Sequence, residues 1–343
     1  MRVSEAAAET NVGRKRRHNE DSFVADPPVF AVADGMGGAQ AGEVASALAA
    51  ETVKESETDP SASGEERVVA LIKAANLRVH QRAASDTSAS GMGTTMTVAL
   101  LEPDGTVAIG HVGDSRAYRL RAGRLEQLTD DHSLVAELVR RGELSPEEAA
   151  VHPQRSVITR ALGTDADVDV DAFTVEARDG DLFLLCSDGL TTMVDTDTIS
   201  GILEQNRGRL EVATRALIKA ANDRGGDDNI TAILFTVADG DGDATVENML
   251  IAAAAASIDT DEDTLHPEDD VRLPLPPATA PPAEMTMVVS ADEIARAREQ
   301  QQQESVSEPE GERASPVRIA IALLVIALLV GLIVLLVLDA LPR

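Results

Sequence analysis

The amino-acid sequence predicts an α+β fold in which sheets and helices form separate layers. Short apolar or alternating runs predict seven β-strands, and longer amphipathic stretches predict four helices. Several strands follow one another directly and the helices lie in long insertions, so a regular βαβ alternation is not expected. The predicted strands are 29–33, 95–101, 107–112, 116–121, 170–175, 182–186 and 230–236, and the predicted helices are 43–54, 65–84, 134–141 and 210–221.

The length and composition are those of a protein with a substantial globular core. The 343 residues are 43 % hydrophobic, which provides enough apolar material for such a core. The single cysteine, Cys186, excludes an intramolecular disulfide and is typical of a reducing compartment. Because Cys186 ends an apolar run, we interpret it as a core residue rather than a nucleophile.

The charge and aromatic content argue against nucleic acid as a partner. The formal net charge is −29, whereas phosphate backbones bind basic protein faces. The aromatic content is only 2 % with no tryptophan, so platforms for base stacking are not expected. Much of the acid lies in 239–243, 259–263 and 268–270, and we assign that charge to a solvated tail.

A change of composition near residue 237 divides the chain into four predicted parts. Residues 1–237 form the globular domain. Residues 238–316 contain acidic clusters, a proline-rich stretch and a glutamine tract, which are typical of a flexible linker. Residues 317–339 are predicted to form one transmembrane helix, and residues 340–343 a short extracytoplasmic tail.

The transmembrane prediction rests on the uncharged apolar stretch 319–338. At 1.5 Å per residue, a helix of this length spans about 30 Å, the thickness of the hydrocarbon core of a bilayer. A buried core helix is the alternative, but the stretch is apolar on every face and follows a polar segment. Arg313 and Arg318 precede it and Arg343 follows it. The positive-inside rule therefore predicts a single-pass protein of the cell membrane with its N-terminal domain in the cytoplasm.

Asp34, Asp188 and Asp228 each lie beside Gly or Asn at the end of an apolar segment. A carboxylate in that position has a desolvation cost unless a cation compensates it, and no Lys or Arg lies within the first two motifs. Gly35 allows a tight turn that can offer its carbonyl as well. Oxygen ligands without His or Cys favour Mg²⁺ or Mn²⁺, and one bridging carboxylate can hold two ions. For Asp34-Gly35 alone, an ordinary turn would be the simpler interpretation.

Two further segments contain groups that suit the same site. In residues 16–22, a guanidinium from Arg16 or Arg17 can clamp a phosphoryl group while Glu20 or Asp21 orders metal-bound waters. A solvated charge cluster is the alternative for this segment. Asp114 lies between two predicted strands, where a hairpin turn with a capping carboxylate is the simpler interpretation. Because Asp114 shares its setting with the three aspartates above, we favour a common site.

The order of these motifs resembles that of the metal-dependent protein Ser/Thr phosphatases of type 2C (PPM), in their bacterial form. The resemblance covers residues 5–237; each motif is weak alone, and their order is highly specific. The series is Arg16…Asn19-Glu20-Asp21, Asp34-Gly35-Met36-Gly37-Gly38, Gly93-Thr94-Thr95, Gly113-Asp114-Ser115-Arg116, Ser187-Asp188-Gly189 and Asp228-Asn229. The resemblance implies a four-layer αββα sandwich with the metals at one edge between two central sheets.

The resemblance also implies which residues bind metal. Asp34 would bridge two ions of Mn²⁺ or Mg²⁺, and the Gly35 carbonyl would bind one of them. Asp188 and Asp228 would bind the other. Asp114 would bind a third, weaker ion together with Asp188.

Other residues would support the site according to the same resemblance. Arg16 would bind the phosphate, Glu20 and Asp21 would act mainly through water, and Asn229 would lie just outside the metal ligands. Met36 occupies the position where many eukaryotic relatives have a histidine that is a proposed general acid. Because methionine cannot donate a proton, metal-bound water or another group would protonate the leaving alkoxide.

Two other segments of the matching region receive supporting roles. Residues 133–155 resemble a mobile flap that would tune access and substrate choice rather than chemistry. The Thr94-Thr95 pair, with Gly91 and Gly93, is interpreted as structural, because it would allow a tight entry into a core strand.

We therefore predict a membrane-anchored phosphatase that removes phosphate from serine and threonine by direct attack of a metal-bridging hydroxide. It would counteract bacterial Ser/Thr kinases. Its partners would be phosphorylated proteins and, by analogy, transmembrane Ser/Thr kinases and their substrates. One alternative is a catalytically weak phosphoprotein-binding signalling module on the same fold, which the full set of carboxylates disfavours. A second is a scaffold in which the acidic tail is the working part.

Overall fold

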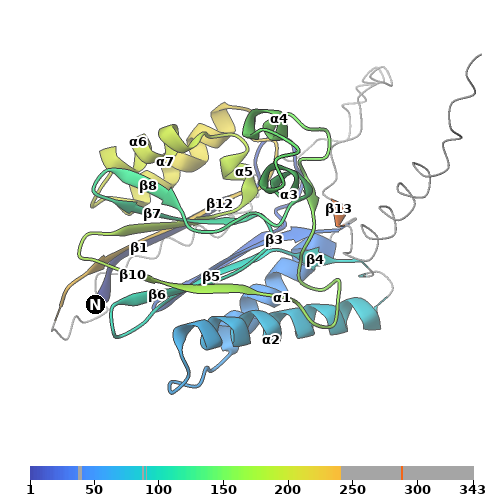
Figure 1. The fold of residues 1–343 in the computed structure, drawn as a ribbon, viewed down its shortest axis with the longest axis horizontal. Helices are drawn as coiled ribbons and strands as arrows, with labels where there is room; N and C mark the ends of the chain where they lie inside the picture. The colour runs from blue at the N-terminus through green and yellow to red at the C-terminus, as the bar shows by residue number, and fades with distance from the viewer. Residues whose placement is uncertain (38–40, 87–88, 90, 241–286, 289–343) are drawn as a thin grey trace, which may run out of the picture. The chain divides into compact units, whose positions relative to one another are not determined.

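Two antiparallel β-sheets packed face to face form the centre of the molecule, and helices cover both outer faces (Figure 1). The computed structural model describes residues 1–37, 41–86, 89 and 91–240, together with the backbone of 287–288. All of them belong to the first of two units, Met1–Ala291, and the second, Asp292–Arg343, lies outside the described residues. The predicted α+β class with separate layers is confirmed.

Each sheet joins strands that are far apart in the sequence. The first sheet has the order β1 (Arg2–Asn11), β12 (Ile230–Ala238), β11 (Leu182–Cys186), β7 (Arg116–Arg121) and β8 (Arg124–Gln127). The second has the order β10 (Asp171–Glu176), β6 (Thr106–Val112), β5 (Met96–Leu101), β3 (Val29–Met36) and β2 (Asp21–Asp26), with β4 (Gly93–Thr94) beside β3.

The helices form two outer layers and a flap. The second sheet is covered by α1 (Ala41–Glu55) and α2 (Gly64–Ser85). The first sheet is covered by α5 (Asp188–Thr191), α6 (Thr196–Gln205) and α7 (Leu210–Asp223). Two short helices, α3 (Leu134–Arg140) and α4 (Pro146–Ala150), lie at one end of the sheets and form the flap (Figure 1). The four-layer αββα arrangement expected from the resemblance is therefore present.

A stack of three phenylalanines joins the two sheets. The Phe30 and Phe235 ring centroids are 4.1 Å apart, and those of Phe183 and Phe235 are 5.0 Å apart. Phe30 lies on β3 of one sheet, whereas Phe183 and Phe235 lie on β11 and β12 of the other. Because large aromatic side chains bury much apolar area, this stack holds the two sheets in face-to-face contact.

The outer layers pack through separate apolar clusters. On α2, Leu71 and Ile72 are buried against the second sheet, and Leu217 of α7 is buried against the first. The contact of α2 with β6 depends on Gly110, because a Cβ atom there would lie 2.8 Å from the Cδ1 atom of Ile72. Close packing of this kind fixes the helix on the sheet and leaves little room for larger residues.

All seven predicted strands and all four predicted helices are present, with ends shifted by a few residues. The sequence patterns missed β1, which contains three consecutive alanines with weak strand preference. Tertiary pairing compensates, because β1 pairs with β12 from Arg2 to Asn11, with one irregularity at Ser4. The strand containing Asp34 also continues further than predicted, to Met36, because Gly35 and Met36 pair with β4.

Among the described residues, no helix is both long enough and apolar enough to cross a bilayer. The predicted transmembrane helix 317–339 and the tail 340–343 lie outside the described residues. So does the predicted linker 238–316, apart from 238–240 and 287–288. The backbone of Met287–Val288 forms β13, which pairs in parallel with β9 (Val157–Ile158).

The aromatic stack between the sheets gives a prediction about stability. Phe235→Ala should lower the free energy of unfolding by about 3–5 kcal/mol, because it removes a fully buried ring from the centre of the stack. Phe173→Ala, on the edge strand β10 where the ring is only half-buried, is the matched control and should cost less. Urea denaturation of both variants measures the difference. Equal losses would show that the stack does not hold the sheets together.

Candidate active site

The predicted metal ligands lie at one end of the two sheets. Asp34 is near the end of β3, and Asp114 follows β6 in the same sheet. Asp188 follows β11 in the other sheet, and Asp228 comes just before β12, which runs antiparallel to β11. Strands separated by many residues in the sequence therefore bring these carboxylates to one edge.

The electrostatics show that the carboxylates are close together. Burial raises the pKa of Asp34 well above its ordinary value, and the charges of neighbouring aspartates raise it further. These neighbours are Asp21, Asp188, Asp228 and Asp114. Burial also raises the pKa of Asp114 well above its ordinary value, with Asp188 as the largest charged contributor. The aspartates predicted from distant sequence motifs thus form one cluster.

Asp188 lies at the centre of this cluster. Burial raises its pKa to about 6 and the charge of Asp228 adds to that rise, while a hydrogen bond with the side chain of Asp34 lowers it. Two carboxyl groups can make such a bond only when one of them is protonated. A proton is therefore held where two negative charges would otherwise repel each other, and a cation can replace it.

Arg16 partly compensates the cluster. Its Nη2 atom donates a hydrogen bond to Asp228 Oδ2 at 2.8 Å, and its Nη1 atom is 3.7 Å from Glu20 Oε2. A second guanidinium, that of Arg116, is engaged by both carboxylate oxygens of Asp131. Both arginines lower the pKa of Asp188, whereas the charged neighbours with the largest effect on Asp34 are all carboxylates and raise its pKa. The centre of the cluster therefore has an excess of negative charge.

Asp21 is buried behind the cluster and is held by two hydroxyl groups. Its Oδ2 atom accepts hydrogen bonds from Ser187 Oγ at 2.7 Å and from Thr231 Oγ1 at 2.6 Å. Its Oδ1 atom is buried and has no hydrogen-bond partner among the described residues. Burial raises the pKa of Asp21 to about 7. An unpaired oxygen at this place suits the predicted role through ordered water.

Asn229 ties the loop before β2 to the start of β12. Its side-chain oxygen accepts the Glu20 backbone N–H at 2.7 Å, and its side-chain nitrogen donates to the carbonyls of Val12 and His18. The side chain therefore holds the segment that contains Arg16 and Glu20 beside Asp228. That Asn229 lies just outside the metal ligands stays a prediction.

The Thr94-Thr95 pair holds the backbone of Asp34. Thr95 Oγ1 accepts the Asp34 N–H at 3.0 Å, while Thr94 Oγ1 and the Thr95 N–H donate to the Asp34 carbonyl. Thr95 Oγ1 also bonds to Ser115 Oγ at 2.8 Å, beside Asp114. The pair is structural, as predicted, but it acts on the site: it connects the backbones that carry two of the carboxylates.

His132 holds the loop of Asp114 in place, a role that no sequence pattern indicated. The ring Nδ1 atom of His132 accepts the Gly113 backbone N–H at 3.1 Å, and the His132 backbone N–H donates to the Gly113 carbonyl at 2.7 Å. Its Nε2 atom therefore carries the proton and donates to Asp171 Oδ2 at 3.0 Å. The partners are separated by 19 and 39 residues in the sequence, so only the fold reveals them.

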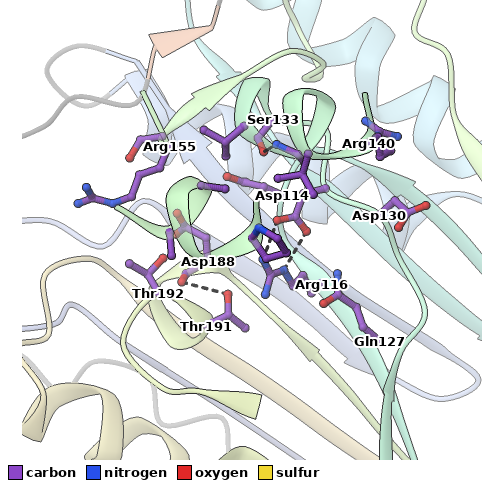
Figure 2. A pocket seen from close by; sticks show the side chains of 18 residues that line it. Asp114, Arg116, Gln127, Asp130, Ser133, Arg140, Arg155, Asp188, Thr191 and Thr192 are labelled. Carbon is purple, nitrogen blue, oxygen red and sulfur yellow. Dashed lines mark hydrogen bonds and ion pairs between the residues drawn. The ribbon is translucent and has the colours of Figure 1, made fainter. Parts of the chain in front are cut away.

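Two cavities open onto this cluster and meet at Asp188. One, of about 300 Å³, is lined by Arg16, Asp188 and Asp228. The other, of about 470 Å³, lies beneath the flap and is lined by Asp114 and Asp188 among others (Figure 2). Asp34 lines neither of these two cavities. The smaller cavity is a place where an anionic group would contact a guanidinium and the carboxylate cluster together.

Comparison with known proteins identifies the family. The model of the family described as protein phosphatase 2C matches residues 13–235. The chain belongs to this family. The serine/threonine phosphatase stp of Listeria welshimeri is 43 % identical over 235 residues, covering 66 % of this chain and 92 % of that protein. The serine/threonine protein phosphatase PstP of Mycobacterium tuberculosis is 41 % identical over 262 residues, which are 76 % of this chain but only 49 % of PstP.

Solved structures agree with this assignment. The crystal structure of the Mycobacterium tuberculosis phosphatase PstP/Ppp is 38 % identical, with a TM-score of 0.65, over 69 % of this chain and all of that one. A second structure, described as the catalytic domain of PstP in complex with two manganese ions, is 36 % identical with a TM-score of 0.64. The prediction of a protein serine/threonine phosphatase is confirmed.

The donor set of this phosphatase fits Mn²⁺ or Mg²⁺. Among the described residues, no three Asp, Glu, His or Cys side chains converge closely enough to enclose a cation on their own. These ions accept backbone carbonyls and water as further ligands, so an open set of oxygens suits them. At Gly35 a Cβ atom would lie 2.1 Å from the Gly42 carbonyl oxygen, so only glycine fits beside Asp34. The unpaired Asp21 oxygen adds a further acceptor behind the site.

The raised pKa values predict how the stability of the metal-free phosphatase depends on pH. Folded Asp188 and Asp21, with pKa values of about 6 and about 7, keep protons that the unfolded chain releases near 3.8. Their contribution to stability is complete below about pH 4 and is lost as the pH rises through about 6 to 7. With a chelator present, the unfolding temperature should therefore fall between about pH 5 and about pH 7.

The control for this pH experiment is Asp188→Asn, which removes one of the titrating groups and should flatten the slope. Added Mn²⁺ should raise the unfolding temperature more at about pH 7 than at about pH 5, because protons compete with the metal for the carboxylates. An unfolding temperature that rises over this range in the chelated protein, and does so equally in the variant, would contradict the raised pKa values.

Proposed function

We propose that this phosphatase hydrolyses phosphoserine and phosphothreonine in proteins at the cluster around Asp188. Asp34, the Gly35 carbonyl, Asp188 and Asp228 would hold two Mn²⁺ or Mg²⁺ ions, and Asp114 a third. The observation that supports this most is the gathering of carboxylates at one edge of the sheets, where burial and then the charges of the neighbouring carboxylates raise their pKa values. The relative solved with two manganese ions supports the same cofactor.

When bound, the metal ions supply charge neutralisation for the phosphoryl oxygens and activation of water for direct attack. The chain itself supplies orientation. Arg16 lines the smaller cavity, where its guanidinium can bind phosphoryl oxygens through two N–H groups. Its ion pair with Asp228 fixes the direction of the guanidinium before the substrate arrives. Asn229 keeps the segment that carries Arg16 in place.

Met36 has no proton to give to the leaving group. Its side chain is buried against Ile158 and Ala161 rather than in the cavity. Burial lowers the pKa of His111 to about 3, and its ring nitrogens contact Thr97 Oγ1 and the Asp130 carbonyl. His111 is therefore neutral and engaged elsewhere. We propose that the leaving alkoxide takes its proton from water in the open cavity.

A substitution at the centre of the cluster tests the metal assignment. Asp188→Asn removes a charged ligand of one of the two main ions and of the third, weaker ion, so it should lower turnover of a phosphothreonine peptide by at least about 100-fold. Isothermal titration calorimetry should show that fewer Mn²⁺ ions bind and that they bind with lower affinity. Asp169→Asn, whose side chain is 90 % exposed, is the matched control and should change neither quantity. Normal Mn²⁺ binding by Asp188→Asn would contradict the assignment of this carboxylate as a ligand.

We also propose that residues 317–339 anchor the phosphatase in the cell membrane with its catalytic domain in the cytoplasm. The support is the sequence alone: an uncharged apolar stretch with arginines before it. A tether raises the local concentration of membrane-bound substrates, so transmembrane Ser/Thr kinases and their targets are the proposed partners.

Membrane anchoring has a direct test in fractionated cells. The full chain should remain with membranes after washes with high salt and with alkaline carbonate, because an inserted helix is not released by breaking ionic contacts. A variant ending at residue 240 should appear in the soluble fraction with unchanged turnover of a soluble phosphopeptide. Release of the full chain by either wash would contradict a spanning helix.

A further inference from the structure

The cavity beneath the flap is larger than the catalytic cavity and continuous with it. It has a volume of about 470 Å³, within the range of pockets that bind ligands. Arg155, Ser156, Asp188 and Thr192 line both cavities. In Figure 2 Arg155 and Thr192 lie beside Asp188 on one side, and Arg140 and Asp130 lie beyond Asp114 on the other. A polypeptide whose phosphoryl group occupies the catalytic cavity therefore lies directly beside the cavity beneath the flap.

The roof of this cavity is apolar and packs against no protein core. Neither α3 nor α4 has a buried residue. Small apolar side chains line the cavity from both helices: Val135, Ala136 and Val139 from α3, and Pro146, Ala149 and Ala150 from α4. In most amphipathic helices such a face is covered by the core, whereas here it faces a hollow.

The roof is nevertheless well formed and held at its base. Ser133 caps α3, and Ser145 and Glu148 form a capping box at α4. Where the flap leaves and rejoins the domain, Ser133 pairs with Ile158, and the Thr159 N–H donates to the His132 carbonyl. The apolar face is therefore presented in a defined position above the floor of the cavity.

The charges around the cavity favour neither sign of side chain. The floor carries the carboxylates of Asp114, Asp130 and Asp188, and the flap side carries Arg140 and Arg155. Arg116 is neutralised by Asp131 through two hydrogen bonds of 2.8 Å and 2.7 Å. Because charges of both signs flank the space, the apolar roof is the feature that can discriminate between side chains.

We propose that the cavity beneath the flap is a substrate subsite that binds an aliphatic side chain next to the phosphorylated residue. The proposal rests on the proposed function, because the phosphoryl group must occupy the cavity at Arg16 and Asp228. Aliphatic atoms entering this space replace water against the faces of α3 and α4. Since one apolar contact of this kind typically changes specificity by about 10-fold or more, the preference is measurable in kcat/KM.

The first experiment uses the full chain with Mn²⁺ and a set of phosphothreonine peptides. Leucine, serine, lysine or aspartate is placed in turn at each position flanking the phosphothreonine. We expect leucine to raise kcat/KM by about 10-fold or more over the other three at one position. An equal or larger preference for lysine would overturn the proposal and indicate Asp130 as the determinant. A preference for aspartate, or none, would overturn it as well.

The second experiment fills the cavity from its roof. Ala136→Phe and Ala149→Phe each add a ring where the substrate side chain would bind, so both should reduce the ratio of kcat/KM for the leucine peptide to that for the serine peptide toward one. Val151→Phe is the matched control, because Val151 is in the same flap, 78 % exposed, and does not line the cavity. It should keep the preference of the parent. Two filling variants on different helices guard against one that fails to fold.

The two levels of the proposal fail in different ways. Hydrolysis of p-nitrophenyl phosphate needs only the catalytic cavity, so its absence with Mn²⁺ would contradict the proposed function itself. Hydrolysis of that compound and of all peptides, with the leucine preference retained in both filling variants, would contradict only the subsite. Loss of the preference in both filling variants but not in Val151→Phe would support it.

Discussion

The mutual repulsion of buried carboxylates at one edge of the two sheets is the constraint on which the site depends. Asp34, Asp114 and Asp188 lie at the ends of buried, apolar strands that bring them together. Their pKa values rise because burial disfavours the charged form. Arg16 forms an ion pair with Asp228, whereas none of the ion pairs within the described part of the chain includes Asp34. The metal-free fold therefore retains protons that divalent cations can replace, so metal binding and stability are linked.

The fold keeps these carboxylates together against their repulsion by holding the backbones that carry them. Thr95 bonds to the Asp34 backbone and to Ser115, and His132 accepts a hydrogen bond from Gly113. The segments that carry Asp34 and Asp114 in the second sheet are therefore held in place. Asn229 and Asp21 do the same between the two sheets, through bonds that join the start of β2 and the loop before it to Ser187 after β11 and to the start of β12. Because these groups are buried or half-buried, each unmade bond would cost more than an exposed one.

The sequence predicted the layers and the charged residues of the site, but not the groups that hold them. Asp188 and Asp228 were recognisable because a carboxylate beside Gly or Asn at the end of an apolar run is a local pattern. Thr231 and His132 show no such pattern: their roles come from contacts with Asp21 and Gly113, which are distant in the sequence. Strand β1 was missed for a related reason, since its alanines become a strand through pairing with β12 rather than through their own preference.

The two sides of the active site differ in how they are supported, and this separates chemistry from substrate choice. The floor is continuous with the core, so substitutions near Asp34 or Asp188 disturb the packing and the proposed metal ligands together. The roof formed by α3 and α4 contributes no buried residue, so its apolar side chains can change at little cost to folding. With the proposed subsite beneath the flap, substrate choice could change while one catalytic centre is kept, because the free energy of binding beneath the flap is not needed to hold the fold together.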